Sequence, residues 1–515
     1  MAQPNEKLAE SLEVLKKLQI NGISSVIKSS EISRTHRERL VKTGFLKQII
    51  QGWYVTKNPN ENRGETTYWY TNYWAFCQRY LKENYNEDYT LSAEQSLLMH
   101  AGSTVIPQQL LIKSSKGINS PTNLLFDTSL YVLKSPISNK IETEEFNGVR
   151  IMTKEFSIVY SSLTMFKHNP IEVRTVLALI RDSSEILRPL LAGSHTVKAG
   201  RIAGAFRNIG RNEIADEIVK TMRSADFRVI EEDPFEYTTP SILDTRERSP
   251  YANRIRLLWS EMREAIIKNF PKAPGLPKDN KTFLKSIEDI YVTDAYHSLS
   301  IERYRVSKEL IEKVRSGDWN IEKEEDRKHR DAMAARGYWQ ATQAVKASIE
   351  KILEGGNAGK TFRSDHRGWY QELFAPSVRV GLLNPADLAG YRTNQVYISN
   401  SMHPPRNKHA LRDAMPIFIE LLETEPEASV RAVLGHFIFV YIHPYMDGNG
   451  RMARFLMNTM LTSGGYPWTV IPVEKRKTYM FSLEQASVKN DIVPFSNFIA
   501  DLVQKSMNGN PVAKL

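Results

Sequence analysis

One segment of twelve residues gathers the side chains that phosphate chemistry needs. It reads HPYMDGNGRMAR over residues 443–454. The imidazole of His443 has an ordinary pKa near neutrality and can take a proton from a hydroxyl. The carboxylate of Asp447 is a hard oxygen ligand of the kind that Mg²⁺ prefers beside nucleotide phosphates. Arg451 and Arg454 are spaced to lean over one site and to grip phosphate oxygens with planar forks. The segment therefore predicts transfer of a phosphate-containing group.

The elements around this segment must place it in a loop that opens on a helix. Apolar residues 433–442 have helical periodicity and stop before Pro444, because the residue preceding a proline is disfavoured in the α region. A second helical run, 452–461, follows directly. Between them, residues 448–450 leave backbone N–H groups free to form an anion nest, and the following helix adds its partial positive end. The alternative, a glycine-rich turn with an exposed histidine, does not account for all these features within twelve residues.

The same segment resembles the motif of the Fic family, H-x-F-x-[D/E]-G-N-G-R-x-x-R. It matches every defined position except Tyr445, where the family has phenylalanine. Residues 390–392, 395–398 and 403–405 resemble the family's flap, and residues 464–499 resemble its closing helices. The resemblance spans about residues 250–505. It implies an all-helical core with a short β-hairpin flap, which transfers AMP from ATP to a Ser, Thr or Tyr hydroxyl of a protein target.

The resemblance also implies a role for each matching residue. His443 would be the general base and Asp447 would hold Mg²⁺. Asn449 and the flanking glycine amides would receive the α-phosphate, Arg451 the β-phosphate region and Arg454 the γ-phosphate, and two residues further along the chain would flank the adenosine. The expected ATP-binding residues are Gly448, Asn449, Gly450, Arg451, Arg454, Tyr479 and Leu483. Gly450 argues against the phosphorylating branch of the family, which has lysine there.

The flap is expected over about residues 394–405. An extended target segment would add to it by main-chain pairing, with little reading of its sequence. The expected target-docking residues are Val396, Tyr397 and Ile398.

A second motif lies at the end of an expected helix over about residues 294–303. Residues 298–302, SLSIE, resemble the inhibitory motif [S/T]-x-x-x-E-[G/N] of Fic proteins. Ser298 and Glu302 are four residues apart, so both can face one partner. Glu302 would pair with Arg454 and so occupy the arginine that the γ-phosphate needs. Arg303 departs from the family's glycine or asparagine, and a bulky cation there would strain the helix end or compete for Glu302.

Residues 1–60 predict a small winged helix-turn-helix. Leucines recur at helical spacing from Leu8 to Leu18, a short helix is expected over 23–28, and two strands are expected over 47–55. Ser33 is placed to cap a further helix that carries three arginines. Basic residues early on such a helix are what contact with a DNA major groove requires, so double-stranded DNA is an expected partner through residues 30–57. The alternative is an exposed amphipathic helix in a packing domain. The three arginines are Arg34, Arg37 and Arg39.

Residues 61–235 predict a mixed α/β domain. Residues 7–230 resemble AbiEi-type antitoxins and transcription factors, whose DNA binding the resemblance implies. An acidic, proline-containing stretch at 229–243 predicts the boundary with a Fic domain over 245–505. The expected fold class is therefore mainly α, with a winged helix-turn-helix and a mixed domain before the all-helical core.

Composition limits the remaining classes of function. The 515 residues carry a net charge of +10 and are 41% hydrophobic, which is ordinary for a globular chain. The single cysteine, Cys77, can form neither an intramolecular disulfide nor a zinc site by itself. Neither a membrane-spanning run nor a secretory signal is evident, so a cytoplasmic location without a membrane partner is expected.

The leading hypothesis is a Mg²⁺-dependent protein adenylyltransferase, autoinhibited by Glu302, which also modifies itself. The alternative is a DNA-binding regulator or antitoxin-like protein whose Fic part senses ATP or removes AMP. The target protein, the DNA sequence and a homodimeric state are left open.

Overall fold

The computed structural model describes residues 4–20, 25–60, 65–136, 142–235, 249–318 and 330–515. The chain forms two compact units. The first comprises Met1–Pro250 together with Tyr397–Pro404, and the second comprises Tyr251–Val396 together with Pro405–Leu515. The predicted boundary at 229–243 falls partly on residues 236–248, which lie outside the described residues.

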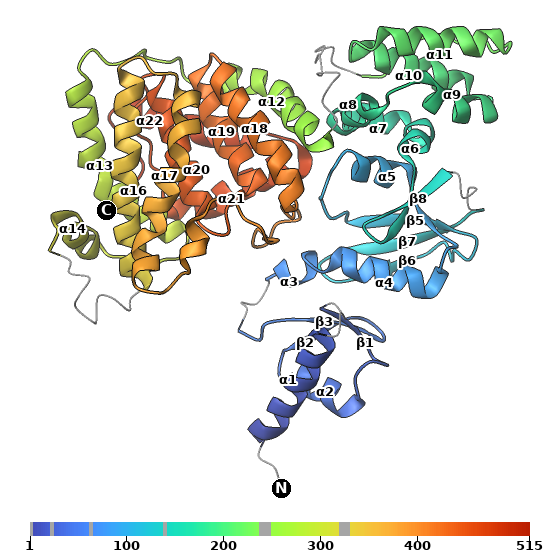
Figure 1. Ribbon diagram of the computed structural model, residues 1–515, viewed down its shortest axis with the longest axis horizontal. Coiled ribbons are helices and arrows are strands. Elements are labelled where there is room, and N and C mark those ends of the chain that lie inside the picture. The colour runs from blue at the N-terminus through green and yellow to red at the C-terminus, as the bar shows by residue number, and fades with distance from the viewer. Residues whose placement is uncertain (1–3, 21–24, 61–64, 137–141, 236–248, 319–329) are drawn as a thin grey trace. The chain divides into compact units, whose positions relative to one another are not determined.

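The first unit begins with two helices and a small sheet (Figure 1). Ser33 caps the second helix by accepting a hydrogen bond from the backbone N–H of His36. The strands pair antiparallel in the order β1-β3-β2. The elements are α1 (Pro4–Ile20), β1 (Val26–Lys28), α2 (Arg34–Lys42), β2 (Leu46–Ile50) and β3 (Trp53–Thr56).

The short helix predicted over 23–28 is wrong where the structure describes it, because Val26–Lys28 is strand β1. Val26 and Ile27 are both fully buried, and they pack into two different core clusters. Two consecutive β-branched residues can fill cores on opposite faces only in an extended chain. Pairing with β3 therefore decides this segment.

A second sheet and a cluster of aromatic side chains form the middle of the first unit. Its order is β4-β5-β7-β6, with β5 and β7 parallel, and β8 and β9 form a separate hairpin. Alternate residues of β5, Leu110 and Ile112, are buried against Trp69 and Phe76. The elements are α3 (Thr67–Tyr70), α4 (Tyr73–Tyr85), β4 (Thr90–Leu91), α5 (Ala93–His100), β5 (Gln109–Ser114), β6 (Pro121–Asn123), β7 (Ser129–Lys134), β8 (Thr143–Phe146) and β9 (Val149–Met152).

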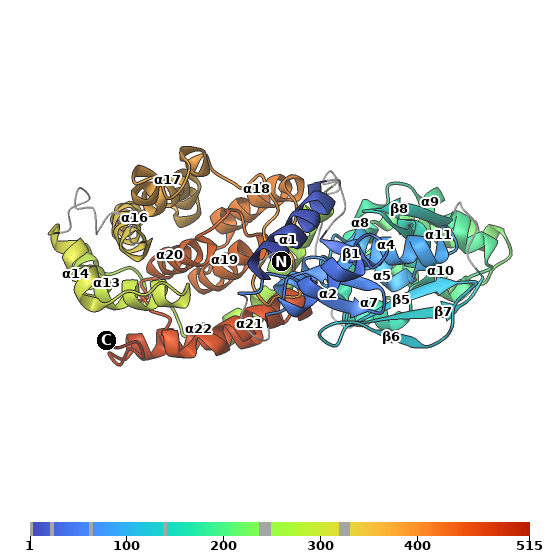
Figure 2. The same cartoon turned by 90° about the horizontal axis from the view of Figure 1, so that it is seen from below.

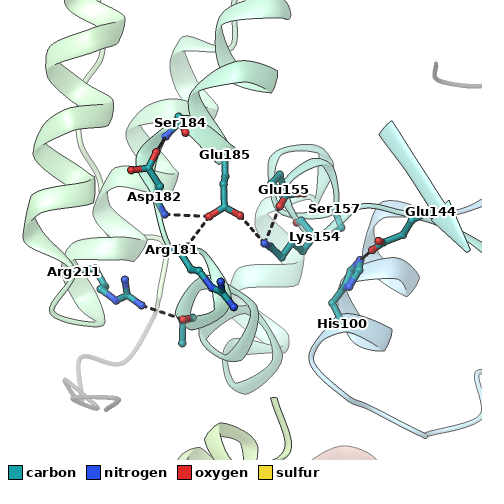
Figure 3. A network of polar contacts seen from close by, with 11 residues as sticks. His100, Glu144, Lys154, Glu155, Ser157, Arg181, Asp182, Ser184, Glu185 and Arg211 are labelled. Atoms are coloured by element: carbon teal, nitrogen blue, oxygen red, sulfur yellow. Dashed lines mark hydrogen bonds and ion pairs between the residues drawn. The ribbon is translucent and has the colours of Figure 1, made fainter. Parts of the chain in front are cut away.

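Six helices complete the first unit, and ion pairs of Lys154 join two of them (Figure 3). The Nζ of Lys154 lies 2.6 Å from Glu185 and 3.0 Å from Glu155. Glu185 also accepts hydrogen bonds from the backbone of Arg181 and Asp182, so one carboxylate caps its own helix and holds a neighbouring one. The helices are α6 (Lys154–Tyr160), α7 (Leu163–His168), α8 (Pro170–Leu179), α9 (Ser183–Ala192), α10 (Thr196–Asn208) and α11 (Asn212–Ser224).

The described residues of the second unit form helices and no strands (Figure 1 and Figure 2). Helix α19 is buried along almost its whole length and packs against α20. The helices are α12 (Pro250–Asn269), α13 (Asn280–Ile301), α14 (Lys308–Ser316), α16 (Arg330–Leu353), α17 (Ala358–Arg379), α18 (Lys408–Thr424), α19 (Ala428–Ile442), α20 (Asn449–Thr462), α21 (Arg476–Lys489) and α22 (Val493–Met507), with short 3₁₀ turns at Pro385–Leu388 and Val473–Lys475. The predicted mainly α chain with a helical core is confirmed.

The predicted β-hairpin flap is wrong. Residues 394–405, all of which the structure describes, contain no strand. Residues 397–404 belong to the first unit, where the backbone N–H of Ile106 donates to the carbonyl of Met402 and Thr66 donates to the side chain of Asn400. Hydrogen-bonding groups of this segment are thus used by residues far away in the sequence, rather than by a partner strand beside it.

Candidate active site

His443 stands at the end of α19. Its backbone N–H donates to the carbonyl of Phe439, and its φ of +55° is left-handed, so the chain leaves the helix sharply before Pro444. The ring Nδ1 lies 3.2 Å from the carbonyl of Val440. A proton on Nδ1 would be donated there, which leaves the lone pair of Nε2 available as a base. Burial, with the charge of Arg392 acting in the same direction, lowers the pKa of His443 to about 4, so the imidazole is neutral at neutral pH.

The loop after His443 is held by side chains that bond to its backbone. The amide of Asn449 bonds to both backbone groups of Tyr445, at 2.9 and 2.8 Å. The Tyr445 ring stacks on that of Tyr370 at 3.8 Å between centroids. The side chain of Asn449 thus uses its oxygen and one of its N–H groups to hold the backbone of Tyr445. The loop is therefore held in shape by contacts within the protein.

Arg392 clamps the same loop from outside. Its Nε donates to the carbonyl of His443 at 2.7 Å, and its backbone N–H donates to the carbonyl of Pro444 at 2.9 Å. Burial lowers the pKa of Arg392 to about 10. The sequence resemblance of residues 390–392 to the Fic flap did not predict these contacts of Arg392. Its donors hold carbonyl groups of the loop that starts at His443, which suits Arg392 to position that loop.

The predicted anion nest lies at the first turn of α20, whose amides have no partners within the helix. Gly448 caps the helix with a φ of +79°, and its N–H donates to Asp447 at 2.6 Å. A Cβ on Gly450 would lie 2.2 Å from the Oε1 of Glu302. Glycine at 450 thus lets a carboxylate approach the helix N-terminus directly.

Both arginines of the motif carry buried N–H groups with no acceptor among the described residues. Arg451 is 1% exposed, and its guanidinium lies between the rings of Phe374 and Tyr304, at 4.9 and 5.1 Å. Its Nε and Nη2 lack hydrogen-bond partners within the described chain, as does the Nη1 of Arg454. Buried charged donors without acceptors are costly. A phosphate chain would supply the acceptors that these donors lack.

The remaining donors of Arg454 are taken by helix α13. Its Nε donates to the Ser298 hydroxyl at 2.8 Å, and its Nη2 donates to the Ser298 carbonyl at 3.0 Å and to Glu302 Oε1 at 2.8 Å. Burial alone would lower the pKa of Arg454, but the Glu302 carboxylate holds it above its ordinary value. The structure thus brings Ser298, Glu302 and Arg454 together.

Glu302 owes its position to the way α13 ends. The N–H of Arg303 donates to the carbonyl of Ser300, and the N–H of Tyr304 donates to that of Leu299, which is the Schellman pattern. Arg303 occupies the left-handed position of that pattern, with a φ of +68°. Glycine is favoured there because it has no Cβ. The backbone at Arg303 is therefore strained.

The carboxylate of Asp447 fits the Mg²⁺ role that its motif implies. Its side chain is 63% exposed beside the nest and lies 3.6 Å from Arg451 Nη2. In the part of the chain that the structure describes, no group of three or more metal-ligating side chains exists. Mg²⁺ commonly binds through one carboxylate while phosphates and water complete its shell. A single accessible carboxylate at the anion nest suits that arrangement.

Tyr479 and Leu483 are core residues on α21. Tyr479 is 1% exposed, its hydroxyl lies 2.7 Å from His436 Nε2, and burial raises its pKa to about 12. The three expected target-docking residues do not all belong to one unit. Val396 is buried in the second unit, whereas Tyr397 and Ile398 belong to the first.

Asp294 is a buried carboxylate that the sequence reasoning missed. It lies four residues before Ser298 on α13 and accepts a hydrogen bond from the Tyr338 hydroxyl at 2.6 Å. Burial raises the pKa of Asp294 to about 6, although Tyr338 and Arg454 act in the opposite direction. Polar residues at 294, 298 and 302, each four apart on a helix with many apolar residues, were the available signal.

Parts of this chain are similar to known proteins. Residues 364–461 match the Fic/DOC family. The chain is 38% identical over 133 residues to the protein adenylyltransferase Fic of Drosophila willistoni, covering 25% of this chain and 26% of that protein. It is 30% identical over 234 residues to the protein of the same name from Drosophila virilis, covering 44% of each.

A solved structure of Fic-1, residues 134–508, from C. elegans is 18% identical with a TM-score of 0.38, covering 66% of this chain and 91% of that one. The chain thus spans between a quarter and a half of the length of the curated relatives named above. No described helix is both long and apolar enough to cross a membrane. The residues that match the Fic/DOC family, 364–461, contain the whole loop from His443 to Arg454.

Proposed function

We propose that this chain is a protein adenylyltransferase, which transfers AMP from ATP to a Ser, Thr or Tyr hydroxyl of a target protein and of itself. One observation carries the proposal: buried N–H groups of Arg451 and Arg454 lack acceptors at a helix N-terminus, next to a neutral His443. The names of the curated relatives support the same activity.

In the proposed reaction, Nε2 of His443 accepts the proton of the target hydroxyl. The hydroxyl oxygen bonds to the α-phosphorus, the bond from that phosphorus to the bridging oxygen breaks, and pyrophosphate leaves. Arg451 and Arg454 bind the β- and γ-phosphates and stabilise the charge that develops on them. Asp447 would hold Mg²⁺, which neutralises phosphate charge when bound. Tyr479 and Leu483 would back the adenosine from the core.

We further propose that Glu302 restrains this activity. Its carboxylate lies against Gly450 and takes a donor of Arg454. A triphosphate reaching for Arg454 meets this negative charge and must displace it. ATP that binds without displacing Glu302 would have its α-phosphate misplaced for attack.

Transfer of labelled AMP tests the proposal. ATP labelled at the α-phosphate should label protein in a lysate, whereas ATP labelled at the γ-phosphate should not. His443→Ala should lower labelling by about 10²- to 10⁴-fold, the usual contribution of a general base, and should keep most ATP affinity. His409→Ala is the matched control, since His409 is exposed on α18. Equal labelling by His443→Ala, or label from the γ-phosphate, would contradict the assignment.

For the first unit we propose binding of double-stranded DNA through residues 30–57. Arg34 is 82% exposed on the capped helix α2, where it pairs with Glu38. Arg37 donates to the carbonyl of Ser29, and Arg39 donates to the Ser11 hydroxyl, so these two also stabilise the fold. Arg34→Ala should therefore lower the slope of log affinity against log salt by about one. An unchanged slope would contradict DNA contact by Arg34 and favour the alternative, in which α2 only packs within its domain.

The alternative function is a DNA-binding regulator whose Fic part senses ATP or removes AMP. A tight, salt-dependent shift of DNA without any AMP transfer would favour it. We also propose a cytoplasmic location, and light scattering would test a homodimer.

A further inference from the structure

A pocket in the second unit, separate from the ATP site, contains two arginines. It is a small pocket, partly open to solvent, that lies among the start of α12, the start of α18 and the end of α19. Arg254 and Arg406 line it together with the rings of Tyr251 and Tyr441. The rest of the wall is mostly apolar and includes Ile255, Leu411 and Ala414.

Arg406 has a donor with no acceptor. Its Nη2 is buried, and no described group accepts a hydrogen bond from it. The guanidinium lies over the ring of Tyr251, 4.8 Å from the centroid. Burial lowers the pKa of Arg406 to about 10; the tyrosines Tyr441 and Tyr251 raise it, and the cation of Arg254 lowers it. A cation in an apolar pocket is costly unless an anion pairs with it.

Arg254 adds a second positive charge to the same pocket. It is 2% exposed, and its Nε donates to the Tyr441 hydroxyl at 2.8 Å while its Nη2 donates to Asn490 at 3.3 Å. These bonds hold its guanidinium in place beside the pocket.

We propose that this pocket binds a small monocarboxylate with a short apolar chain. The carboxylate would accept a hydrogen bond from the buried Nη2 of Arg406 and pair with its charge. The apolar wall would cover a chain of a few carbons, and the narrow space excludes a nucleotide.

The pocket is connected to the catalytic loop, a consequence that rests on the proposed function. The carbonyl of Arg406 accepts a hydrogen bond from Arg392, whose Nε holds the carbonyl of His443. Tyr441 and Ile442, which also line the pocket, directly precede His443. A carboxylate that draws Arg406 inward would therefore alter the position of His443.

Binding is measured on the full chain by thermal denaturation, with no reference to AMP transfer. Sodium butyrate should raise the Tm in a saturable manner, whereas sodium chloride at the same ionic strength should not. Arg406→Gln should weaken the apparent butyrate affinity at least tenfold. Arg412→Gln is the matched control because Arg412 is exposed on α18.

Ala414→Leu provides a second variant, in case Arg406→Gln does not fold. It should fill the pocket and remove the butyrate response while both arginines remain. Absence of a butyrate-specific shift in the unmodified protein, or an equal shift in Arg406→Gln and Ala414→Leu, would overturn the proposal. Tighter binding of inorganic phosphate than of butyrate would overturn the monocarboxylate assignment. Loss of AMP transfer with an intact butyrate response would refute the proposed function alone.

Discussion

Replacing Glu302 by glycine should raise AMP transfer about tenfold or more. The Oε1 of Glu302 lies 2.8 Å from Arg454 Nη2, and the side chains of the two residues are 31% and 3% exposed. A hydrogen bond between charged groups contributes about 1.5 to 3 kcal/mol, and partial exposure of Glu302 favours the lower end. About 1.4 kcal/mol corresponds to one factor of ten in rate, so loss of this competition predicts at least that gain.

The assay is the initial rate of AMP incorporation, from ATP labelled at the α-phosphate, into the chain itself and into lysate proteins. Glu302→Gln separates charge from backbone, since it keeps the size of the side chain and leaves the end of α13 unchanged. Glu312→Gln, at an exposed site on α14, is the control. Activity of both Glu302 variants at or below that of the unmodified protein would refute autoinhibition and leave the catalytic assignment standing. A gain in the glycine variant alone would show that the charge is not what restrains transfer.

Three further predictions concern residues that support the site. Arg303→Gly should relieve the left-handed backbone at φ +68°, stabilise the chain by about 1 kcal/mol in urea denaturation and lower basal transfer. Arg392→Lys should remove the guanidinium that holds the His443 carbonyl and should slow AMP transfer about tenfold. ATP affinity, measured by calorimetry, should be nearly unchanged. An equal loss of transfer rate and of ATP affinity would contradict a positioning role. The pKa of Asp294, about 6 when folded against 3.8 ordinarily, means that the folded state keeps a proton that the unfolded state loses. This stabilisation is complete below pH 4 and is lost as pH rises through 6. The free energy of unfolding of Asp294→Asn should therefore rise relative to the unmodified protein between pH 4 and 7, by up to about 3 kcal/mol. Parallel curves of stability against pH for the two proteins would refute this prediction.

The loop between α19 and α20 was predictable because the residues that cause it lie close together in the sequence. Pro444 ends one helix and the glycines begin the next, so the loop, its nest and the spacing of Arg451 and Arg454 follow from local rules. The cap of α2 by Ser33 was predictable for the same reason. Capping and proline effects depend on residues that are neighbours in the sequence, so a single sequence is enough to predict them.

Contacts between distant segments were decided only by the tertiary structure. Val26–Lys28 is a strand because it pairs with β3. Residues 394–405 do not form the predicted hairpin, and polar groups of this segment accept hydrogen bonds from residues more than 250 positions away in the sequence. Burial in the folded chain also determined which charged donors lack hydrogen-bond acceptors, which costs free energy. It left N–H groups of Arg451, Arg454 and Arg406 without acceptors in the described chain.

The sequence by itself thus determined which chemical groups the site contains, since residue types and local spacing choose a base, an anion nest and two cations. The tertiary structure alone decided which of those groups are already paired, as Arg454 is with Glu302, and which are still available. Pairing and burial depend on neighbours that folding brings together across the chain, and local sequence rules do not contain those neighbours.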